Sequence, residues 1–333
     1  MLSCPVCGLP LNRRESSFTC DNAHVFDVAK EGYVNLLLAQ HRHSKDPGYS
    51  KEMIAARRDF FDRGHYERLA DDLAAIISGY LPDASATVLD AGCGEGYYLR
   101  RLRRRLAWAR QADSTILCGL DISKHGIRVA ARRDPDGLYA VAGTFRMPVL
   151  PDRIDVLLTH FSPVSAVDFR RVVRPGGIVL VGGPGEDHLY SFKELLYDTP
   201  TRFEPSGSLT EADGFEPVAT HRIRYKLELR GAGQVANLLA MTPFYWSADV
   251  GTQARLAAVE NSTPRLTSSS RPTGESPARN DPGPYRRARE RPRRHRPLYG
   301  LPGPRAARGR RSRHPPDRAH ADRDAPLQPC RGG

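Results

Sequence analysis

The sequence predicts an α/β fold in which helices cover both faces of a parallel sheet, with a small metal-binding module in front of it. Three observations predict this fold. Strand-like apolar runs alternate with helix-like segments between about residues 50 and 247, a glycine-rich turn follows the first run, and cysteines gather at the amino terminus. Strands that alternate with helices are typical of parallel sheets with helical crossovers.

The elements are expected in the following order. Residues 1–38 form the metal-binding module and 39–84 a connector with two amphipathic helices, broken near Gly64. Residues 85–259 hold five buried strands at 87–90, 115–121, 138–142, 154–159 and 177–182, with helices at 97–107 and 124–133. A possible edge strand at 221–229 and a helix at 232–241 follow. Residues 260–333 are rich in Arg and Pro and lack a hydrophobic period, so we expect no regular structure there.

The net charge of +12 is confined to the end of the chain. Residues 261–333 hold 18 Arg, no Lys and 6 acidic residues, which leaves 32 basic and 32 acidic residues before them. The overall charge is therefore no argument for nucleic-acid binding. Any affinity for RNA would have to come from a local basic patch such as residues 41–45, His-Arg-His-Ser-Lys. The alternative is that this segment is an ordinary solvated loop.

The amino terminus predicts a zinc site. Cys4 and Cys7 form one pair of ligands, and Cys20 and His24 form a second pair after a spacer of twelve residues. Three thiolates and one imidazole suit a structural, tetrahedral Zn²⁺ with no position left for a catalytic water. Unrelated thiols beside a surface histidine are the alternative. The chain has no stretch of ~18 apolar residues and no signal peptide, which predicts a cytoplasmic protein without a membrane segment. Because the cytoplasm is reducing, we expect no disulfides.

The glycine-rich turn predicts a cofactor site. Asp90, Gly92, Gly94 and Gly96 follow an apolar strand directly and open a helix, so that backbone amides can approach a ligand closely. The spacing of these glycines resembles the first motif of class I methyltransferases, where the turn accommodates the amino-acid end of S-adenosylmethionine. Asp121 ends the second strand, where its carboxylate can accept both ribose hydroxyls; a helix cap before Ser123 is the alternative.

Two further patterns belong to the same comparison. Arg174-Pro-Gly-Gly177 is widespread in these enzymes, and we expect it to turn the chain from a helix into the fifth strand. The acidic residue that many of them carry after the third strand is missing, since Ala142-Gly-Thr-Phe145 stands there. Adenine recognition would then depend on backbone groups and apolar contacts.

Several motifs in order resemble one family. They are the Cys3His start, residues 24–37, Lys45-Asp-Pro-Gly48, Gly64-His-Tyr66, residues 90–98 and Met241-Thr-Pro-Phe244. Over residues 1 to about 259 the chain resembles the bacterial 23S ribosomal RNA guanine-N1 methyltransferases. The resemblance implies a class I S-adenosylmethionine-dependent methyltransferase domain, a homodimer and methyl transfer to N1 of a guanine in one 23S rRNA hairpin. By matching position it implies zinc at Cys4, Cys7, Cys20 and His24, and cofactor contacts from Tyr66, Tyr98, Leu99 and His188.

The resemblance also leads to finer predictions. Residues 94–98 and 40–48 look like the branch that modifies guanine 745 rather than the branch that modifies guanine 748 and confers macrolide resistance. After the fourth strand, Phe161 stands where it could stack on a flipped guanine while a backbone carbonyl accepts the N1 proton; ordinary loop packing is the alternative. No carboxylate stands out as a general base.

Three alternatives stay open. Family members end in a short apolar strand that closes the sheet, whereas no such strand is expected after about Asn261. Arginine without lysine indicates a frame-shifted reading of a GC-rich gene, and a basic RNA-binding tail is the other interpretation. A small-molecule methyltransferase and a non-catalytic RNA-binding zinc protein are the rival functions; the zinc module argues against the first, and donor binding would exclude the second.

Overall fold

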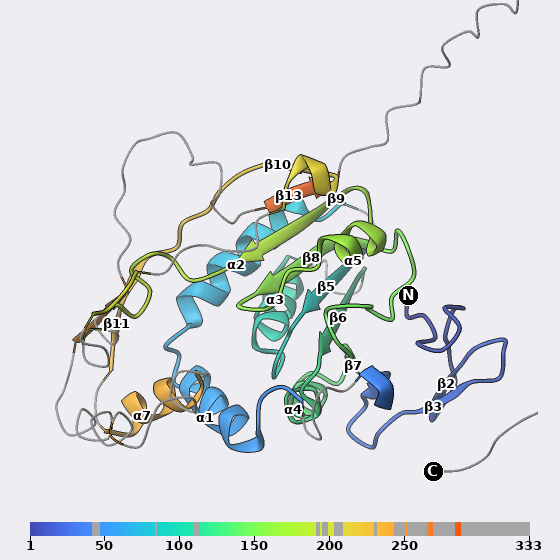
Figure 1. Ribbon diagram of the computed structural model, residues 1–333, viewed down its shortest axis with the longest axis horizontal. Coiled ribbons are helices and arrows are strands. Elements are labelled where there is room, and N and C mark those ends of the chain that lie inside the picture. The colour runs from blue at the N-terminus through green and yellow to red at the C-terminus, as the bar shows by residue number, and fades with distance from the viewer. Residues whose placement is uncertain are drawn as a thin grey trace, which may run out of the picture. The chain divides into compact units, whose positions relative to one another are not determined.

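A mixed β-sheet organises the fold (Figure 1). The computed structural model describes residues 1–41, 47–83, 85–109, 114–190, 194, 199–202, 209–229, 232–242, 251, 265–268 and 284–287. Within these residues the sheet has eight strands in the order β10-β13-β9-β8-β5-β6-β7-β4. They are β4 (Val34–Asn35), β5 (Ala86–Ala91), β6 (Thr115–Asp121), β7 (Leu138–Val141), β8 (Ile154–His160), β9 (Val173–Gly182), β10 (Phe215–Pro217) and β13 (Pro284–Arg287). The strands from β4 to β9 run parallel, and β13 is antiparallel to both of its neighbours.

Helices connect the strands, as the alternating pattern predicts. They are α1 (Lys51–Asp62), α2 (Glu67–Tyr80), α3 (Tyr97–Trp108), α4 (Lys124–Arg133), α5 (Ala166–Val172) and α7 (Ala232–Ala240), with 3-10 turns at Ala39–His41 and Glu211–Asp213. The five predicted strands and the helices of the connector are confirmed. None of the described helices is long and apolar enough to cross a membrane.

The fifth strand differs from the prediction. β9 begins at Val173, directly after α5, so the Arg174–Gly177 pattern lies inside the strand instead of forming a turn before it. The pairing of β9 with β8 shifts register between Ile154 and Val156, opposite this segment. Gly176 has φ +80°, a backbone conformation that a side chain would strain, so the pattern makes an irregularity in the strand and not a separate turn.

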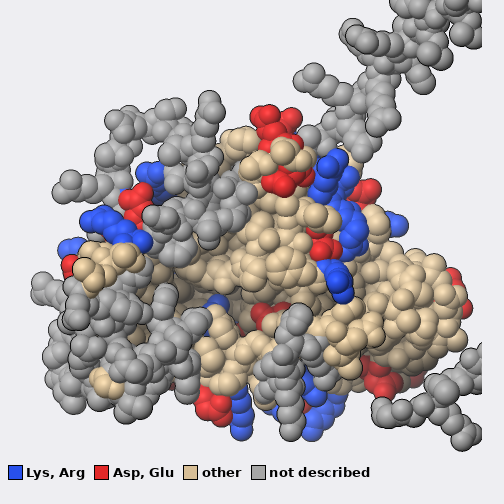
Figure 2. All heavy atoms as spheres, in the orientation of Figure 1, with Lys and Arg blue, Asp and Glu red and all other residues tan. Residues whose placement is uncertain are grey.

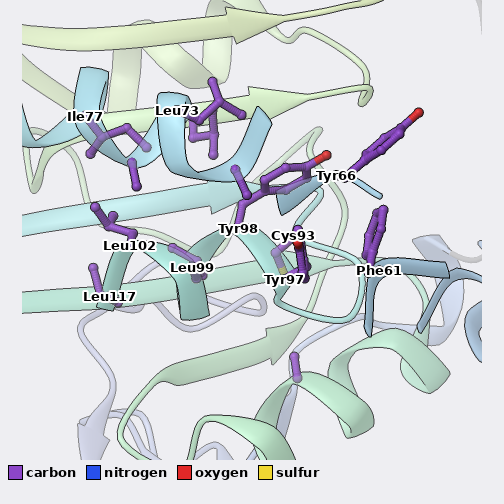
Figure 3. Close-up of a cluster of buried hydrophobic side chains, with 14 of the residues drawn as sticks. Phe61, Tyr66, Leu73, Ile77, Cys93, Tyr97, Tyr98, Leu99, Leu102 and Leu117 are labelled. Atoms are coloured by element: carbon purple, nitrogen blue, oxygen red, sulfur yellow. The ribbon is translucent and has the colours of Figure 1, made fainter. Parts of the chain in front are cut away.

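Two hydrophobic cores lie against the sheet. One core gathers residues from α1, α2, α3 and α4, and Figure 3 shows its aromatic end, with Phe61, Tyr66, Tyr97 and Tyr98, beside an aliphatic part that includes Leu102. The other core gathers α5, the opposite sides of the strands and apolar residues of the metal-binding module. Because both faces of the sheet are covered, the strands read as continuous apolar runs.

The metal-binding module is part of this sheet. Its strands β1 (Asn12–Arg13), β2 (Ser17–Thr19) and β3 (Val25–Asp27) form a small antiparallel sheet, but β4 pairs in parallel with β7. The amide of Ser3 also donates to the carbonyl of Pro148 at 2.9 Å, and Leu2 bridges to Val149. Glu31 forms ion pairs with Arg128 and Arg132 of α4. The module therefore docks through backbone pairing, a shared core and charge.

The expectation of no strand after about residue 261 is wrong for two short segments. β12 (Arg265–Ser268) pairs with β11 (Tyr225–Glu228) in a separate two-stranded sheet, so the predicted edge strand at 221–229 is shorter and lies outside the main sheet. β13 lies between β9 and β10, with Tyr285 opposite Val179. The backbone supplies this pairing, which is why a segment with few apolar residues can occupy the position. The frame-shift interpretation stays a prediction.

Candidate active site and metal centre

The four predicted metal ligands come together. Their ligand atoms all lie within 4.8 Å of one another. The Sγ atoms of Cys7 and Cys20 are 3.7 Å apart, and the Nδ1 atom of His24 is 3.5 Å from the sulfur of Cys4 and 3.3 Å from that of Cys20. A tetrahedral zinc ion would place two sulfurs about 3.8 Å apart and a sulfur and a nitrogen about 3.6 Å apart. The donor set and its spacing therefore fit one structural zinc ion.

The glycine turn joins β5 to α3, as predicted. Gly92, Gly94 and Gly96 have φ of +95°, +56° and +77°, which favour glycine. Two of these positions also have no room for a side chain. A Cβ atom on Gly92 would lie 2.0 Å from the Oγ of Ser162, and one on Gly96 would lie 2.9 Å from the Cβ of Ala130. The turn is thus packed between the loop after β8 and α4.

Asp121 lies at the carboxyl end of β6 and is tied to the glycine turn. Its Oδ2 atom accepts a hydrogen bond of 2.8 Å from the amide of Gly94, and its Oδ1 atom accepts one of 2.7 Å from the amide of Ser123. The helix cap considered as an alternative is Ser123 itself, whose side chain accepts from the amide of Gly126. A carboxylate has about four lone-pair sites, so Asp121 keeps acceptor capacity for hydroxyl groups of a ligand.

Asp90 is buried at the end of β5 with an unused acceptor atom. Its side chain is 1% exposed, and Oδ2 has no hydrogen-bond partner among the described residues. Burial, together with the nearby Asp121, raises the pKa of Asp90 to about 8, while the guanidinium of Arg57 acts in the opposite direction. A buried acceptor without a donor is costly. A ligand with a positive group would satisfy it.

Arg57 is a site residue that the sequence analysis missed. It lies on α1, and its Nε atom is 3.6 Å from the position that a Cβ on Gly94 would occupy. Its guanidinium lies over the ring of Phe61 at 4.7 Å and that of Tyr49 at 5.8 Å. The sequence did carry a signal: Arg57 is three residues after the buried Ile54 and four before Phe61, so a cation interrupts the apolar stripe of the helix.

A second part of the site is an aromatic cavity at the carboxyl ends of β8 and β9. Its volume is about 140 Å³, and its lining includes Tyr66, His160, Phe161, His188 and Tyr225. The ring centroids of His160 and Phe161 are 4.3 Å apart, and those of Phe161 and His188 are 5.4 Å apart. Burial lowers the pKa of His160 to about 3, so its imidazole is neutral at physiological pH.

Phe161 has a strained backbone. Its φ is +54°, in the left-handed region that residues other than glycine rarely adopt, and its amide donates to the carbonyl of Gly182 at 3.0 Å. Such strain is typical of functional positions. The side chain is 36% exposed, which leaves the ring accessible from the cavity.

The remaining predicted cofactor contacts lie behind the glycine turn. Tyr98 and Leu99 begin α3 and are 5% and 1% exposed in the core that Figure 3 shows. The ring of Tyr98 meets that of His160 edge-on at 4.9 Å, and its hydroxyl is buried without a partner in the described part of the chain. Tyr98 thus connects the turn to the aromatic cavity, whereas Leu99 packs among aliphatic side chains.

Comparisons with known proteins match both the metal-binding module and the domain that carries the glycine turn. Residues 2–45 match a family model described as the RlmA amino-terminal zinc ribbon, and residues 89–181 match a methyltransferase domain. The chain is 35% identical over 261 residues to the 23S rRNA (guanine(748)-N(1))-methyltransferase of Streptomyces fradiae, covering 76% of this chain and 89% of that protein. It is 33% identical over 257 residues to a candidate 23S rRNA (guanine-N(1)-)-methyltransferase of Bacillus subtilis, covering 74% and 88%.

The chain belongs to the 23S rRNA guanine-N1 methyltransferases. It is an S-adenosylmethionine-dependent enzyme with a zinc ribbon, as the sequence predicted. Figure 2 shows basic and acidic side chains interspersed over one face of the enzyme, in agreement with the equal numbers of basic and acidic residues before residue 261. Residues 42–45 of the basic patch predicted at 41–45 lie outside the described residues.

Proposed function

We propose that the protein transfers the methyl group of S-adenosylmethionine to N1 of a guanine in a hairpin of 23S rRNA, with the guanine flipped into the aromatic cavity. The observation that carries this proposal is the position of Phe161. It is held in a strained conformation, lines the cavity of about 140 Å³, and precedes Ser162, which packs against Gly92 of the glycine turn. Enzymes that modify a base take it out of the stack and hold it between aromatic or apolar side chains.

The donor site would be built around the glycine turn. S-adenosylmethionine supplies an electrophilic methyl group on a sulfonium. Asp121 would accept the ribose hydroxyls, Asp90 would face the amino group, and the amides between Gly92 and Gly96 would line the amino-acid end. Tyr66 and His188 would lie between S-adenosylmethionine and the guanine, since both line the aromatic cavity. This arrangement combines the predicted cofactor residues with the unused acceptor of Asp90.

The aromatic cavity would contribute mainly by positioning the guanine. Phe161 would stack on the guanine, which orients N1 toward the methyl group. The proton on N1 must leave as the new bond forms. A backbone carbonyl of the loop after β8 would accept a hydrogen bond from N1–H and orient it, and the proton would pass to solvent water. The neutral imidazole of His160 would stabilise this loop through its ring contacts with Tyr98 and Phe161.

The finer prediction of guanine 745 rests on residues 94–98 and 40–48 of the sequence. The Streptomyces fradiae relative is named for guanine 748, which makes that nucleotide the competing target. Methyl transfer from tritiated donor to 23S rRNA that lacks the modification tests the activity, and primer extension locates the product, because N1-methylguanine blocks base pairing. A stop at 745 supports the proposal; a stop at 748 overturns the branch; no transfer overturns the activity.

A homodimer is proposed on the family resemblance alone. Light scattering on the zinc-loaded protein tests it, and the mass of one chain, 37.0 kDa, would contradict it.

A further inference from the structure

The guanidinium of Arg57 presents a buried N–H group to the proposed S-adenosylmethionine site. Its Nε atom is inaccessible to solvent and has no hydrogen-bond partner among the described residues. No carboxylate of the described chain lies within ion-pair distance of its guanidinium. Burial raises the pKa of Asp90, Glu95 and Asp121, and the nearby charge of Arg57 opposes this rise in each. Burying a guanidinium nitrogen without an acceptor costs free energy, so a bound ligand that supplies an acceptor would stabilise this arrangement.

The position of this side chain is fixed by its surroundings. Ser50 caps α1 by accepting from the amide of Met53 at 3.2 Å, and the carbonyl of Tyr49 accepts from the hydroxyl of Ser123 at 2.8 Å. The start of α1 is therefore attached to the end of β6, next to Asp121. The rings of Tyr49 and Phe61 then support the guanidinium over Gly94.

The charges around the turn select the group that can bind. The carboxylate of Asp121 would repel an anion that approached the glycine turn without a cation beside it. A ligand whose end carries both an ammonium and a carboxylate matches the two unused groups, because Asp90 offers an acceptor and Arg57 offers a donor. A guanidinium also pairs with a carboxylate through two parallel hydrogen bonds, which fixes the orientation of the ligand.

We propose that Arg57 binds the α-carboxylate of S-adenosylmethionine and thereby selects the intact amino-acid end of the methyl donor. This inference rests on the donor site given under the proposed function. It adds a residue of α1 to a site that is otherwise formed by the ends of β5 and β6. The methyl group and the sulfonium are remote from the carboxylate, so Arg57 positions the donor and takes no part in the transfer itself.

The test compares two ligands that differ only in the carboxylate. Calorimetry on the zinc-loaded full chain measures the affinities of S-adenosylmethionine and of decarboxylated S-adenosylmethionine. We expect the intact donor to bind about ten- to a hundredfold more tightly, the range for hydrogen bonds to charged groups. Arg57→Gln should weaken the intact donor to the level of the decarboxylated one, and Arg57→Lys should restore part of the preference, because charge alone remains.

Arg58 provides the matched control, since it is the neighbouring arginine of α1 and is exposed. Arg58→Gln should keep the preference for the carboxylate unchanged. If Arg57 only stabilises the fold, its variants will weaken both ligands equally and keep their ratio, which would overturn the proposal. Equal binding of both ligands by the unmodified protein would overturn it as well. If the unmodified protein binds neither ligand, the proposed donor site itself fails.

Discussion

At the scale of single residues, Asp90 links donor binding to pH. Burial raises its pKa to about 8 from an ordinary 3.8, so the empty site holds a proton at pH 7. The fold favours this protonated form, and the stability that it contributes below pH 3.8 is lost as the pH rises to about 8. The ammonium of the donor should favour the ionised form instead.

We therefore predict that donor binding releases close to one proton at pH 7 and little at pH 9, and that affinity rises with pH up to about 8. Calorimetry in two buffers of different ionisation enthalpy measures the release. Asp90→Asn should remove this proton and leave only what the donor's own amino group contributes. A binding enthalpy at pH 7 that does not depend on the buffer would contradict the prediction.

Phe161 is the residue on which base stacking is predicted to depend. Stacking of a base on an aromatic side chain contributes about 1–3 kcal/mol, so Phe161→Ala should lower methyl transfer to rRNA by about five- to a hundredfold. Phe161→Tyr keeps the ring and should retain most of the activity. Donor affinity, measured separately, should change little in either variant. Unchanged turnover in the alanine variant would remove Phe161 from the site.

The sequence predicted residues whose position follows from a strand end, and missed those that only the tertiary fold brings in. Asp121 could be placed because it ends an apolar run, and the zinc ligands because their spacing is local. Arg57 lies more than thirty residues before the glycine turn, on a helix whose docking no periodicity describes. Its one sequence signal is a cation within an apolar stripe, which more often indicates a side chain that extends to the solvent.

At the scale of elements, the zinc ribbon supports the edge of the methyltransferase sheet. β4 pairs with β7, and the module shares a hydrophobic core with α5. So short a module depends on metal for its folding, which contributes about 10 kcal/mol or more in zinc-finger peptides. Loss of zinc should therefore uncover β7 as well as unfold the module.

We predict that Cys20→Ser, or a strong chelator, lowers the thermal midpoint and increases hydrogen exchange at Leu36, whose amide donates to the carbonyl of Val141. Amides in the central strands β5 and β8 should stay protected. Cys118→Ser is the control, because this buried cysteine lies in β6, away from the metal ligands, and its variant should still bind one zinc ion. Unchanged exchange at Leu36 after zinc loss would show that the pairing of β4 with β7 is stable without the folded zinc module, and would contradict this prediction.

The same pairing explains which elements the sequence could not predict. Buried strands can be predicted from their long apolar runs, and the bounds of β6 were correct. β4 has two residues and β13 has four, and both join the sheet through backbone hydrogen bonds that leave no hydrophobic period. Their partners are set by tertiary contacts alone.

At the scale of the whole molecule, strands far apart in the chain form the two edges of the sheet, β4 at one edge and β13 with β10 at the other. The compact unit extends from Met1 to Glu290. We predict that a chain ending at Glu290 has an unchanged thermal midpoint, whereas one ending at Asp281 lacks β13, has a lower midpoint and aggregates, because the edge of β9 becomes exposed. Thermal unfolding and light scattering compare the two. Equal stability of both chains would contradict a structural role for β13.

The place of β13 also bears on how the protein is made. In the described sheet, β10 pairs only with β13, although it precedes β13 by more than sixty residues in the chain. During synthesis β10 therefore stays without its strand partner until β13 has emerged from the ribosome. A nascent chain can thus complete its donor-binding half first, while the edge of β9 stays open to chaperones until β13 has been made.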